Sequence, residues 1–398
     1  MSFAVESKWK TQEEKLDIPT KRKRWYIGLP LSENGENRVG LIPSAVSILT
    51  SRGFRIILES GAGEKAGYSD RDFAESGSDI AYSKDEVYKA DIILQCSPPT
   101  LNEINKMRPG QMLISPLHIG SVQFDLIDAM KKKRIVSLAM EYMKDPSGTF
   151  PIVRILSELA GTSAILKAGQ LLSNERYGAG ILLGGISGVS PAKIVILGAG
   201  VVAEYAIRSA LGLGVSIQVF DNNISKLMRL QNILGQRLYT STLDPEILEE
   251  ELVKADVVIG AIHSDNGRTP MVVSEDVVMK MKKGAVIVDV SIDQGGCFET
   301  SETRNHEDPF FVKHGVIHYC VPNISAQYPK SASKAISNIF SSVFTEGGNS
   351  HNLEQFILKS KGLAHGVYMY KGSLTNEYIS SKFGLKYTAL ELILSDDL

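Results

Sequence analysis

The chain has 398 residues, enough for about two or three domains, and its 43% hydrophobic and 22% charged residues are typical of soluble globular proteins. A formal net charge of −2 gives no basic footprint for nucleic acid, and no apolar run reaches the about 18 residues that a membrane span needs. The three cysteines, Cys96, Cys297 and Cys320, lack metal-ligand spacing, which favours a reducing, cytoplasmic compartment and no metal site.

The first part of the chain alternates short apolar runs with amphipathic stretches. Residues 1–24 are highly charged and have no apolar core, which predicts a mobile arm rather than a secretory signal. Pro43 is expected to open a helix at its first turn, and Ser69 or Asp70 is expected to cap another. We expect strands at residues 25–30, 55–59, 90–95, 111–115 and 135–140. This alternation is typical of a parallel α/β sheet.

Three chemically active side chains follow strands predicted in this part. Ser97, His118 and Glu141 each come just after an apolar run. Ligands of open parallel sheets meet the carboxyl ends of the strands, so these residues are candidates for a binding site. A histidine in such a place is also often a hydrogen-bonded structural residue.

A long helix is expected over residues 150–173 and would link two domains. Beyond it we expect strands at 194–197, 215–220, 255–261, 285–290 and 316–320, and helices at 203–213, 274–281, 331–344 and 353–358. If the last helices pack on the first domain, that domain is discontinuous. We therefore predict an α/β fold with two Rossmann-like, doubly wound domains with parallel sheets: a substrate domain of residues 1–150 and 331–398, and a nucleotide-binding domain of residues 151–330.

The strongest motif lies at the start of the nucleotide-binding sheet. After the strand come Gly198, Gly200 and Ala203, the G-x-G-x-x-A dinucleotide fingerprint, which also includes Val201 and Val202. The first glycine allows a sharp turn, the second lets a pyrophosphate approach the backbone, and the alanine lets the helix lie on the strand. The pyrophosphate would sit at the helix N-terminus, whose free N–H groups and dipole favour an anion.

An acidic residue completes this motif. Asp221 ends the next predicted strand, where a carboxylate accepts hydrogen bonds from the adenosine ribose and repels a 2′-phosphate. The expected cofactor is therefore NAD rather than NADP. The alternative is a glycine-rich turn that binds nothing, but strand, glycines, helix and acid all follow in the required order.

Several longer stretches carry a family resemblance. They are VIVDVSIDQGGCFETS (286–301), HYCVPNISA (318–326), GILLGGISGVSPAKIVILGAGVV (180–202) and NRVGLIP (37–43). Through them the chain resembles alanine dehydrogenases and, more distantly, the nucleotide-binding part of proton-translocating transhydrogenases. The resemblance implies an active site between two domains, reversible NAD-dependent deamination of L-alanine to pyruvate and ammonia, and a homo-oligomer, typically a hexamer.

The resemblance also implies roles for single residues. Arg38 would hold the substrate carboxylate through two parallel hydrogen bonds. His118 would act as the acid/base, because imidazole titrates near the working pH. Asp293 would hold the attacking water or the amine. The positions where the family contacts NAD, beyond the fingerprint and Asp221, are Ser157, Lys226, Ile262, His263, Ser291, Ile292, Asn323 and Ile324.

The sequence departs from the family on the substrate side. Where the family has a lysine that binds the keto acid, this chain has Ser97, in LQCSPP. Thr162 stands where arginine is common. Loss of a charge-assisted hydrogen bond costs about 1.5–3 kcal/mol. Two alternatives therefore stay open: a dehydrogenase for another amino acid or an opine- or saccharopine-like secondary amine, and a catalytically silent NAD-binding protein.

Overall fold

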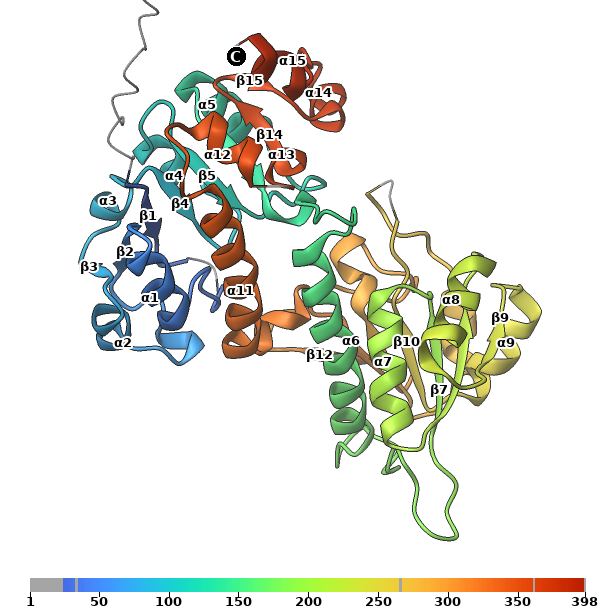
Figure 1. Cartoon of the computed structure of the whole chain (residues 1–398). Helices are drawn as coiled ribbons and strands as arrows, with labels where there is room; N and C mark the ends of the chain where they lie inside the picture. Colours follow the sequence, from blue (N-terminus) through green and yellow to red (C-terminus); the bar gives the residue numbers. More distant parts are fainter. Residues whose placement is uncertain (1–23, 33–34, 265–266, 361, 397–398) are drawn as a thin grey trace, which may run out of the picture.

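The computed structural model describes residues 24–32, 35–264, 267–360 and 362–396. Nearly all of the predicted N-terminal arm, residues 1–23, lies outside the described residues. Figure 1 shows two lobes joined by α6 (Pro151–Leu172) and α11 (Pro329–Gly347), which lie side by side. The long linking helix predicted over 150–173 is confirmed.

The first lobe is built on an eight-stranded sheet ordered β15-β14-β6-β5-β4-β1-β2-β3. The strands are β1 (Tyr26–Leu29), β2 (Arg55–Glu59), β3 (Asp79–Ala81), β4 (Ile92–Leu94), β5 (Met112–Ser115), β6 (Val136–Ala139), β14 (Val367–Tyr370) and β15 (Ser373–Leu374). The six strands β1 to β6 are parallel, whereas β14 pairs antiparallel with β6 and with β15. The first domain is therefore discontinuous, as predicted, because β14 and β15 come from the C-terminal part of the chain.

The second lobe contains a seven-stranded sheet ordered β12-β13-β11-β10-β7-β8-β9. Its strands are β7 (Lys193–Leu197), β8 (Ser216–Phe220), β9 (Tyr239–Ser241), β10 (Val257–Gly260), β11 (Val286–Asp289), β12 (Phe310–Lys313) and β13 (Val316–Tyr319). Without its antiparallel edge strand β12, this order is the doubly wound 3-2-1-4-5-6 arrangement. The predicted α/β fold with two doubly wound domains is confirmed, while the domain limits at 150/151 and 330/331 stay a prediction.

Helices cover both sheets, and apolar side chains fill the space on each face. The central strands β10, β11 and β13 are buried along their whole length, which explains their continuous apolar sequences. In the first lobe the helices are α1 (Pro43–Ser51), α2 (Asp70–Glu75), α3 (Lys84–Val87), α4 (Leu101–Lys106), α5 (Phe124–Lys133), α12 (Leu353–Lys359), α13 (Leu363–Gly366), α14 (Glu377–Phe383) and α15 (Leu390–Asp396). In the second lobe they are α7 (Val201–Gly212), α8 (Ile224–Leu234), α9 (Pro245–Lys254) and α10 (Glu275–Lys280). Short 3-10 helices in the described residues are η1 (Glu64–Ala66) and η2 (Met140–Tyr142) in the first lobe and η3 (Val290–Gln294) and η4 (Ile324–Gln327) after strands of the second.

Local sequence signals place several helix ends as expected. Pro43 is the first residue of α1, and Ser69 caps α2 in a reciprocal capping box with Asp72, a motif worth about 1 kcal/mol. Among the described residues no helix is both long and apolar enough to cross a membrane. The same residues contain no group of three or more His, Cys, Asp or Glu side chains that could hold a metal ion.

The linking helices fix how the two lobes meet. A Cβ on Gly161 of α6 would lie 2.3 Å from the carbonyl oxygen of Val202, so α6 and α7 approach to backbone contact only because this residue is glycine. On the other side, the buried hydroxyls of Ser333 and Ser337 in α11 accept hydrogen bonds from the backbone N–H groups of Val39 and Ile42, each at 3.0 Å. These bonds tie α11 to the segment that carries Arg38.

Candidate active site

The dinucleotide fingerprint forms the turn between β7 and α7. Gly198 has φ +107°, and a Cβ there would lie 2.4 Å from the carbonyl oxygen of Ala261, so only glycine fits. Gly200 is the N-cap of α7, and a Cβ built on it meets nothing within 4 Å. Ala203 is fully buried, while Val201 and Val202 are half-buried in the first turn. The turn therefore has the shape that the sequence predicted.

This turn fits the pyrophosphate of NAD. The 12-residue helix α7 has no side-chain hydrogen bond at its N-cap, so its first N–H groups are left for a ligand. The open space at Gly200 lies at the same end of the helix, where the macrodipole favours an anion. Both features are present before any ligand binds.

Asp221 follows β8 and has two partners in the turn. Its Oδ2 accepts the N–H of Ala199 at 2.7 Å and its Oδ1 accepts the N–H of Asn223 at 2.7 Å. Each carboxylate oxygen has a second lone pair, so Asp221 can brace the fingerprint and still receive ribose hydroxyls. The acid at this position is therefore compatible with the predicted NAD preference.

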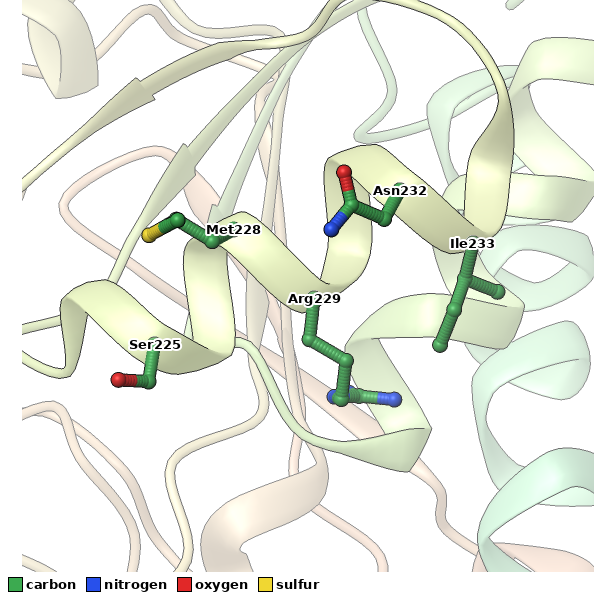
Figure 2. Close-up of a pocket in the computed structure, with 5 residues that line it drawn as sticks. All are labelled: Ser225, Met228, Arg229, Asn232 and Ile233. Atoms are coloured by element: carbon green, nitrogen blue, oxygen red, sulfur yellow. The ribbon is translucent and has the colours of Figure 1, made fainter.

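Helix α8 supports the fingerprint from the outside. The Arg229 guanidinium donates to the carbonyl oxygen of Ala199 at 3.0 Å and pairs with buried Glu204 of α7 at 2.9 Å. Arg229 lines a pocket on α8 of about 340 Å³. Figure 2 shows it with the other lining residues, Ser225, Met228, Asn232 and Ile233. Because one helix supplies the whole lining, this pocket is a surface feature beside the fingerprint. Lys226, in the first turn of the same helix, is exposed.

The loops after β10, β11 and β13 carry the remaining cofactor candidates. Ile262 and His263 follow β10, Ser291 and Ile292 lie in η3, and Asn323 and Ile324 follow β13. Two residues that sequence analysis did not single out hold these loops. Buried Asp289 accepts from Ser291 N–H, Cys297 N–H and the Ser301 hydroxyl at 3.0, 3.0 and 2.7 Å. The Gln294 side chain exchanges two hydrogen bonds of 3.0 Å with the backbone of Ser264.

Asp293 connects the cofactor loops to the substrate side. Its Oδ1 accepts the N–H of Asn323 at 2.8 Å, and Asn323 has the left-handed backbone that brings this N–H into place (φ +53°). Asp293 is accessible to solvent, but surrounding protein desolvates it and raises its pKa, whereas Asn323 and the charges of His118 and Arg38 oppose this rise. His118 and Arg38 are therefore both within electrostatic reach of Asp293.

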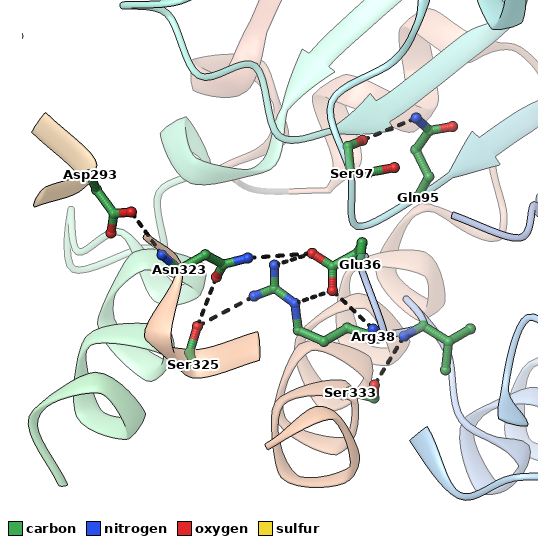
Figure 3. A network of polar contacts seen from close by, with 9 residues as sticks. Glu36, Arg38, Gln95, Ser97, Asp293, Asn323, Ser325 and Ser333 are labelled. Atoms are coloured by element: carbon green, nitrogen blue, oxygen red, sulfur yellow. Dashed lines mark hydrogen bonds and ion pairs between the residues drawn. The ribbon is translucent and has the colours of Figure 1, made fainter. Parts of the chain in front are cut away.

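Arg38 is the centre of a polar network between the lobes (Figure 3). It is only 6% exposed. Glu36 accepts from Arg38 Nε at 2.7 Å and from Nη2 at 2.6 Å, and also from the Arg38 backbone N–H at 2.9 Å. From the other lobe, the Ser325 hydroxyl lies 3.5 Å from Arg38 Nη1, and Asn323 Nδ2 lies 3.5 Å from Glu36 Oε2. The network thus joins the two lobes at Arg38, the predicted substrate-binding residue.

Glu36 fixes which edge of the guanidinium can bind a carboxylate. A guanidinium has five N–H donors, and Glu36 takes the fork formed by Nε and Nη2. Within the described residues, Nη1 makes only the long contact to Ser325, and Nη2 has a second N–H besides the one that it donates to Glu36. Arg38 can therefore still hold a substrate carboxylate end-on, with its orientation set by Glu36.

The segment after β4 supplies no positive charge. Gln95 is buried and donates to the carbonyl oxygen of Ser97 at 3.0 Å, as Figure 3 shows. Burial, together with the charge of Glu36 and against that of Arg38, raises the pKa of the Cys96 thiol to about 12, so Cys96 stays uncharged. No lysine in the described part of the chain pairs with Glu36 or Asp293. The lysine that Ser97 replaces is therefore not compensated in this network.

His118 lies in a loop whose backbone is held from three sides. It has a left-handed backbone (φ +50°), uncommon for a residue with a side chain and often found at functional sites. Glu141 accepts from the N–H groups of Leu117 and His118 at 2.8 and 3.0 Å. Ser121 donates to the His118 carbonyl oxygen from its N–H and hydroxyl at 2.9 and 3.1 Å. The imidazole itself makes no hydrogen bond within the described ranges, which leaves it free for a substrate.

The third support of this loop comes from the C-terminal part of the chain. Lys382 of α14 donates to the carbonyl oxygens of Ile119, Gly120 and Val122 at 3.3, 3.0 and 3.2 Å. The rings of Phe383 and Phe124 pack edge to face next to it, with centroids 5.7 Å apart. Sequence analysis did not identify Lys382, because about 260 residues separate it from the loop that it holds.

The structure thus places the predicted residues in two groups and leaves some outside them. Hydrogen bonds through Asn323 and Glu36 link Asp293 to Arg38 at the lobe junction, and the charge of His118 reaches Asp293. The fingerprint with Asp221 forms a separate turn at the carboxyl end of β7. Ser157, on the first half of α6, is half-buried and makes no hydrogen bond with the described residues. Ser157 and Lys226 therefore gain no support from contacts in the structure.

Comparisons with known proteins agree with this arrangement. Residues 32–160 match the N-terminal domain and residues 164–377 the C-terminal domain of the family described as alanine dehydrogenase/PNT. The chain is 33% identical to the alanine dehydrogenase of Staphylococcus haemolyticus over 373 residues, which cover 93% of this chain and 100% of that relative.

Solved structures point the same way. An L-alanine dehydrogenase superposes with a TM-score of 0.83 at 31% identity, covering 90% of this chain and 99% of the other. A transhydrogenase from Sinorhizobium meliloti superposes with a TM-score of 0.73 at 22% identity, covering 88% of this chain and 99% of the other, which shows a shared fold. The chain therefore belongs to the alanine dehydrogenase/PNT family.

Proposed function

We propose that this chain, an NAD-dependent oxidoreductase, reversibly deaminates L-alanine to pyruvate and ammonia at the junction of its two lobes. One observation carries the proposal: hydrogen bonds link Asp293, in the lobe with the fingerprint, through Asn323 and Glu36 to Arg38 in the other lobe. The charge of His118 acts on the same Asp293 carboxylate and lowers its pKa against the rise that burial causes. Acid/base, carboxylate-binding and water-holding groups thus share one site. The family membership and the relatives named alanine dehydrogenase support the same reaction.

Each side chain has a role that its surroundings allow. Arg38 holds the substrate carboxylate end-on while Glu36 keeps the guanidinium in place. His118 moves the proton as water adds and ammonia leaves, because its ring has no hydrogen bond to give up among the described residues. Asp293 holds the attacking water or the leaving amine, and its raised pKa makes it readier to share a proton.

The lobe with the fingerprint would hold NAD. Bound NAD would supply the acceptor for the hydride that leaves the substrate carbon. Gly200 and the first turn of α7 would hold the pyrophosphate, and Asp221 the adenosine ribose. Ile262, Ser291, Ile292, Asn323 and Ile324, on the loops after β10, β11 and β13, would surround the nicotinamide end, with His263 beside them. Ser157 and Lys226 remain candidates that rest on the family resemblance.

A second candidate keeps the reaction and changes the substrate. Ser97 and its neighbours offer no cation near Arg38, so the keto acid loses a contact that the family provides. A different amino acid, or a secondary amine of the opine or saccharopine type, would then be the better substrate.

The experiment is a keto-acid panel with the purified chain, NADH and ammonium. The proposal predicts fastest NADH oxidation with pyruvate and almost none in the His118→Ala variant. Turnover with another keto acid, or with a keto acid and a primary amine, selects the second candidate. NADH binding without turnover on any member of the panel overturns both and leaves a silent NAD-binding protein.

We further propose that the chain works as a homo-oligomer, a hexamer by family resemblance. Light scattering on the eluting protein gives its mass directly. A mass of six chains is the expected result, and a monomer mass at micromolar concentration contradicts it.

A further inference from the structure

A polar pocket lies beside the substrate site, where the chain crosses between the lobes. Its volume is about 470 Å³, within the range of small-molecule sites. Asn37 lines it from the first lobe, next to Arg38. Lys167 of α6, His306 and the segment Gln327–Pro329 that leads into α11 line it from the other side. Neither the fingerprint turn nor Asp293 belongs to this pocket, so the proposed reaction does not use it.

The pocket is lined by one cation, Lys167, and by no acid. The seven residues that line it include Lys167 and His306 but no carboxylate. Lys167 donates to Gln170 at 3.2 Å and lies 5.9 Å from the centre of the Tyr319 ring. An ammonium has three donors, so Lys167 can bind an anion without losing the bond to Gln170. Burial lowers the pKa of His306, and the charge of Lys167 lowers it further, while Glu36, which does not line the pocket, opposes this fall. His306 is therefore neutral at pH 7, and Lys167 supplies the positive charge that would attract an anion.

His306 faces the pocket as a hydrogen-bond donor. The amide nitrogen of Gln327 lies 3.2 Å from His306 Nδ1 and 2.8 Å from the Tyr319 hydroxyl. An amide NH₂ group only donates, so Nδ1 accepts and the neutral ring carries its proton on Nε2. Lys167 and His306 thus present two donors that suit carboxylate oxygens.

Asn37 needs a hydrogen-bond donor on the ligand, whereas Lys167 and His306 need an acceptor. Its side-chain oxygen is buried and has no hydrogen-bond partner within the described residues, although a buried acceptor normally has one. A ligand that carries a hydroxyl or ammonium group beside its carboxylate would supply the missing donor.

We propose that this pocket binds a small hydroxy- or amino-carboxylate, with Lys167 and His306 holding its carboxylate and Asn37 accepting from its hydroxyl or ammonium group. The ligand would contact both lobes at the crossing that positions Arg38. The proposal does not depend on the reaction assigned above, because it concerns binding in a separate pocket.

The test is calorimetric titration of the full chain, with L-malate as the probe. We expect saturable binding of one malate per chain, a several-fold weaker response to succinate, which lacks the hydroxyl, and none to the neutral analogue malamide. Inorganic phosphate separates carboxylate recognition from general oxyanion binding; tighter binding of phosphate than of malate overturns the carboxylate assignment.

Variants locate the bound probe. Lys167→Gln and His306→Asn should each weaken malate binding about ten-fold, which is about 1.4 kcal/mol. Lys167→Arg should restore most of the affinity, and Lys254→Gln, a surface lysine on α9, should change nothing. Arg38→Gln should retain binding, because that residue belongs to the substrate site. The thermal melting temperature of each variant reports on folding.

Three results would overturn the proposal: no saturable malate binding to the unmodified chain, unchanged affinity in a folded Lys167→Gln variant, or loss of binding in Arg38→Gln with retention in Lys167→Gln. The last result would place malate in the substrate site. None of these results depends on whether the chain turns over pyruvate, so failure here and failure of the proposed reaction are distinct.

Discussion

The fingerprint turn and the Arg38 network are held together in different ways. The turn at Gly198–Ala203 is built from backbone: a left-handed glycine, an uncapped helix end and one carboxylate that accepts two N–H groups. The Arg38 network is built from side chains of both lobes, and its donors and acceptors are largely paired with each other. We infer from this difference that cofactor binding depends on the local backbone, whereas the choice of substrate depends on a few side chains that single substitutions can change.

The largest effects should come from the two fingerprint glycines, which separate folding from binding. Gly198→Val should prevent formation of the turn, because its Cβ would lie 2.4 Å from the Ala261 oxygen. Gly200→Ala should leave stability within about 0.5 kcal/mol, because its Cβ meets open space, but should weaken NADH binding at least about ten-fold. Thermal melts and fluorescence titration with NADH measure the two effects. Undiminished NADH binding by Gly200→Ala would remove the pyrophosphate from this turn.

The next largest effect tests the Arg38 network and the neighbouring position Ser97. Ser97→Lys supplies a cation where the family resemblance implies a lysine that binds the keto acid, and should lower the KM for pyruvate about ten-fold, the scale of one charge-assisted hydrogen bond. Steady-state kinetics at saturating NADH provide the measurement, with Ser97→Gln as the uncharged control. An unchanged KM in the lysine variant would show that the lost charge does not set the substrate preference.

A smaller effect should follow from the support of the His118 loop. Lys382→Met keeps the aliphatic stem but removes three hydrogen bonds to carbonyl oxygens, so His118 should be less well placed. We expect kcat to fall about three- to ten-fold with an unchanged KM for NADH, and Lys382→Arg to recover most of it. Loss of thermal stability without a change in kcat would reduce Lys382 to a structural residue.

The smallest effect concerns stability and pH. The folded-state pKa of Asp293 lies above its unfolded value, so its ionisation costs stability above the folded pKa, and this cost disappears below the unfolded pKa of about 3.9. Asp293→Asn should therefore melt about 1–3 °C higher than the unmodified chain near pH 8, with a gap that closes toward pH 4. A variant that melts lower at pH 8 would show that the ionised carboxylate is stabilising.

The same contrast explains what the sequence could reveal. The strands and the turn around Gly198 were predictable, because apolar runs and glycine geometry are local signals. Short strands such as β3, β12, β14 and β15 were not predicted, and β14 joins β6 across more than 200 residues. Strands of two to four residues contain too few alternating side chains to be distinguished from loops in the sequence.

The candidate site divides in the same way. Arg38, His118 and Asp293 could be named from motifs, but their meeting depends on how the two lobes pack. Glu36 is only two residues before Arg38, and a carboxylate so close to a substrate arginine was a usable signal. Lys382 and Asp289 gave none, because their partners, apart from the Ser301 hydroxyl on Asp289, are backbone groups, which look alike in every sequence.

The most direct test of the account is the transfer of hydrogen from substrate to cofactor. The chain is incubated with NAD and L-alanine that carries deuterium on Cα, and the NADH formed is weighed by mass spectrometry. The account predicts NADH that is one mass unit heavier, and none of this product with the His118→Ala variant. NADH without deuterium, or no NADH from any amino acid or secondary amine tested, would contradict it.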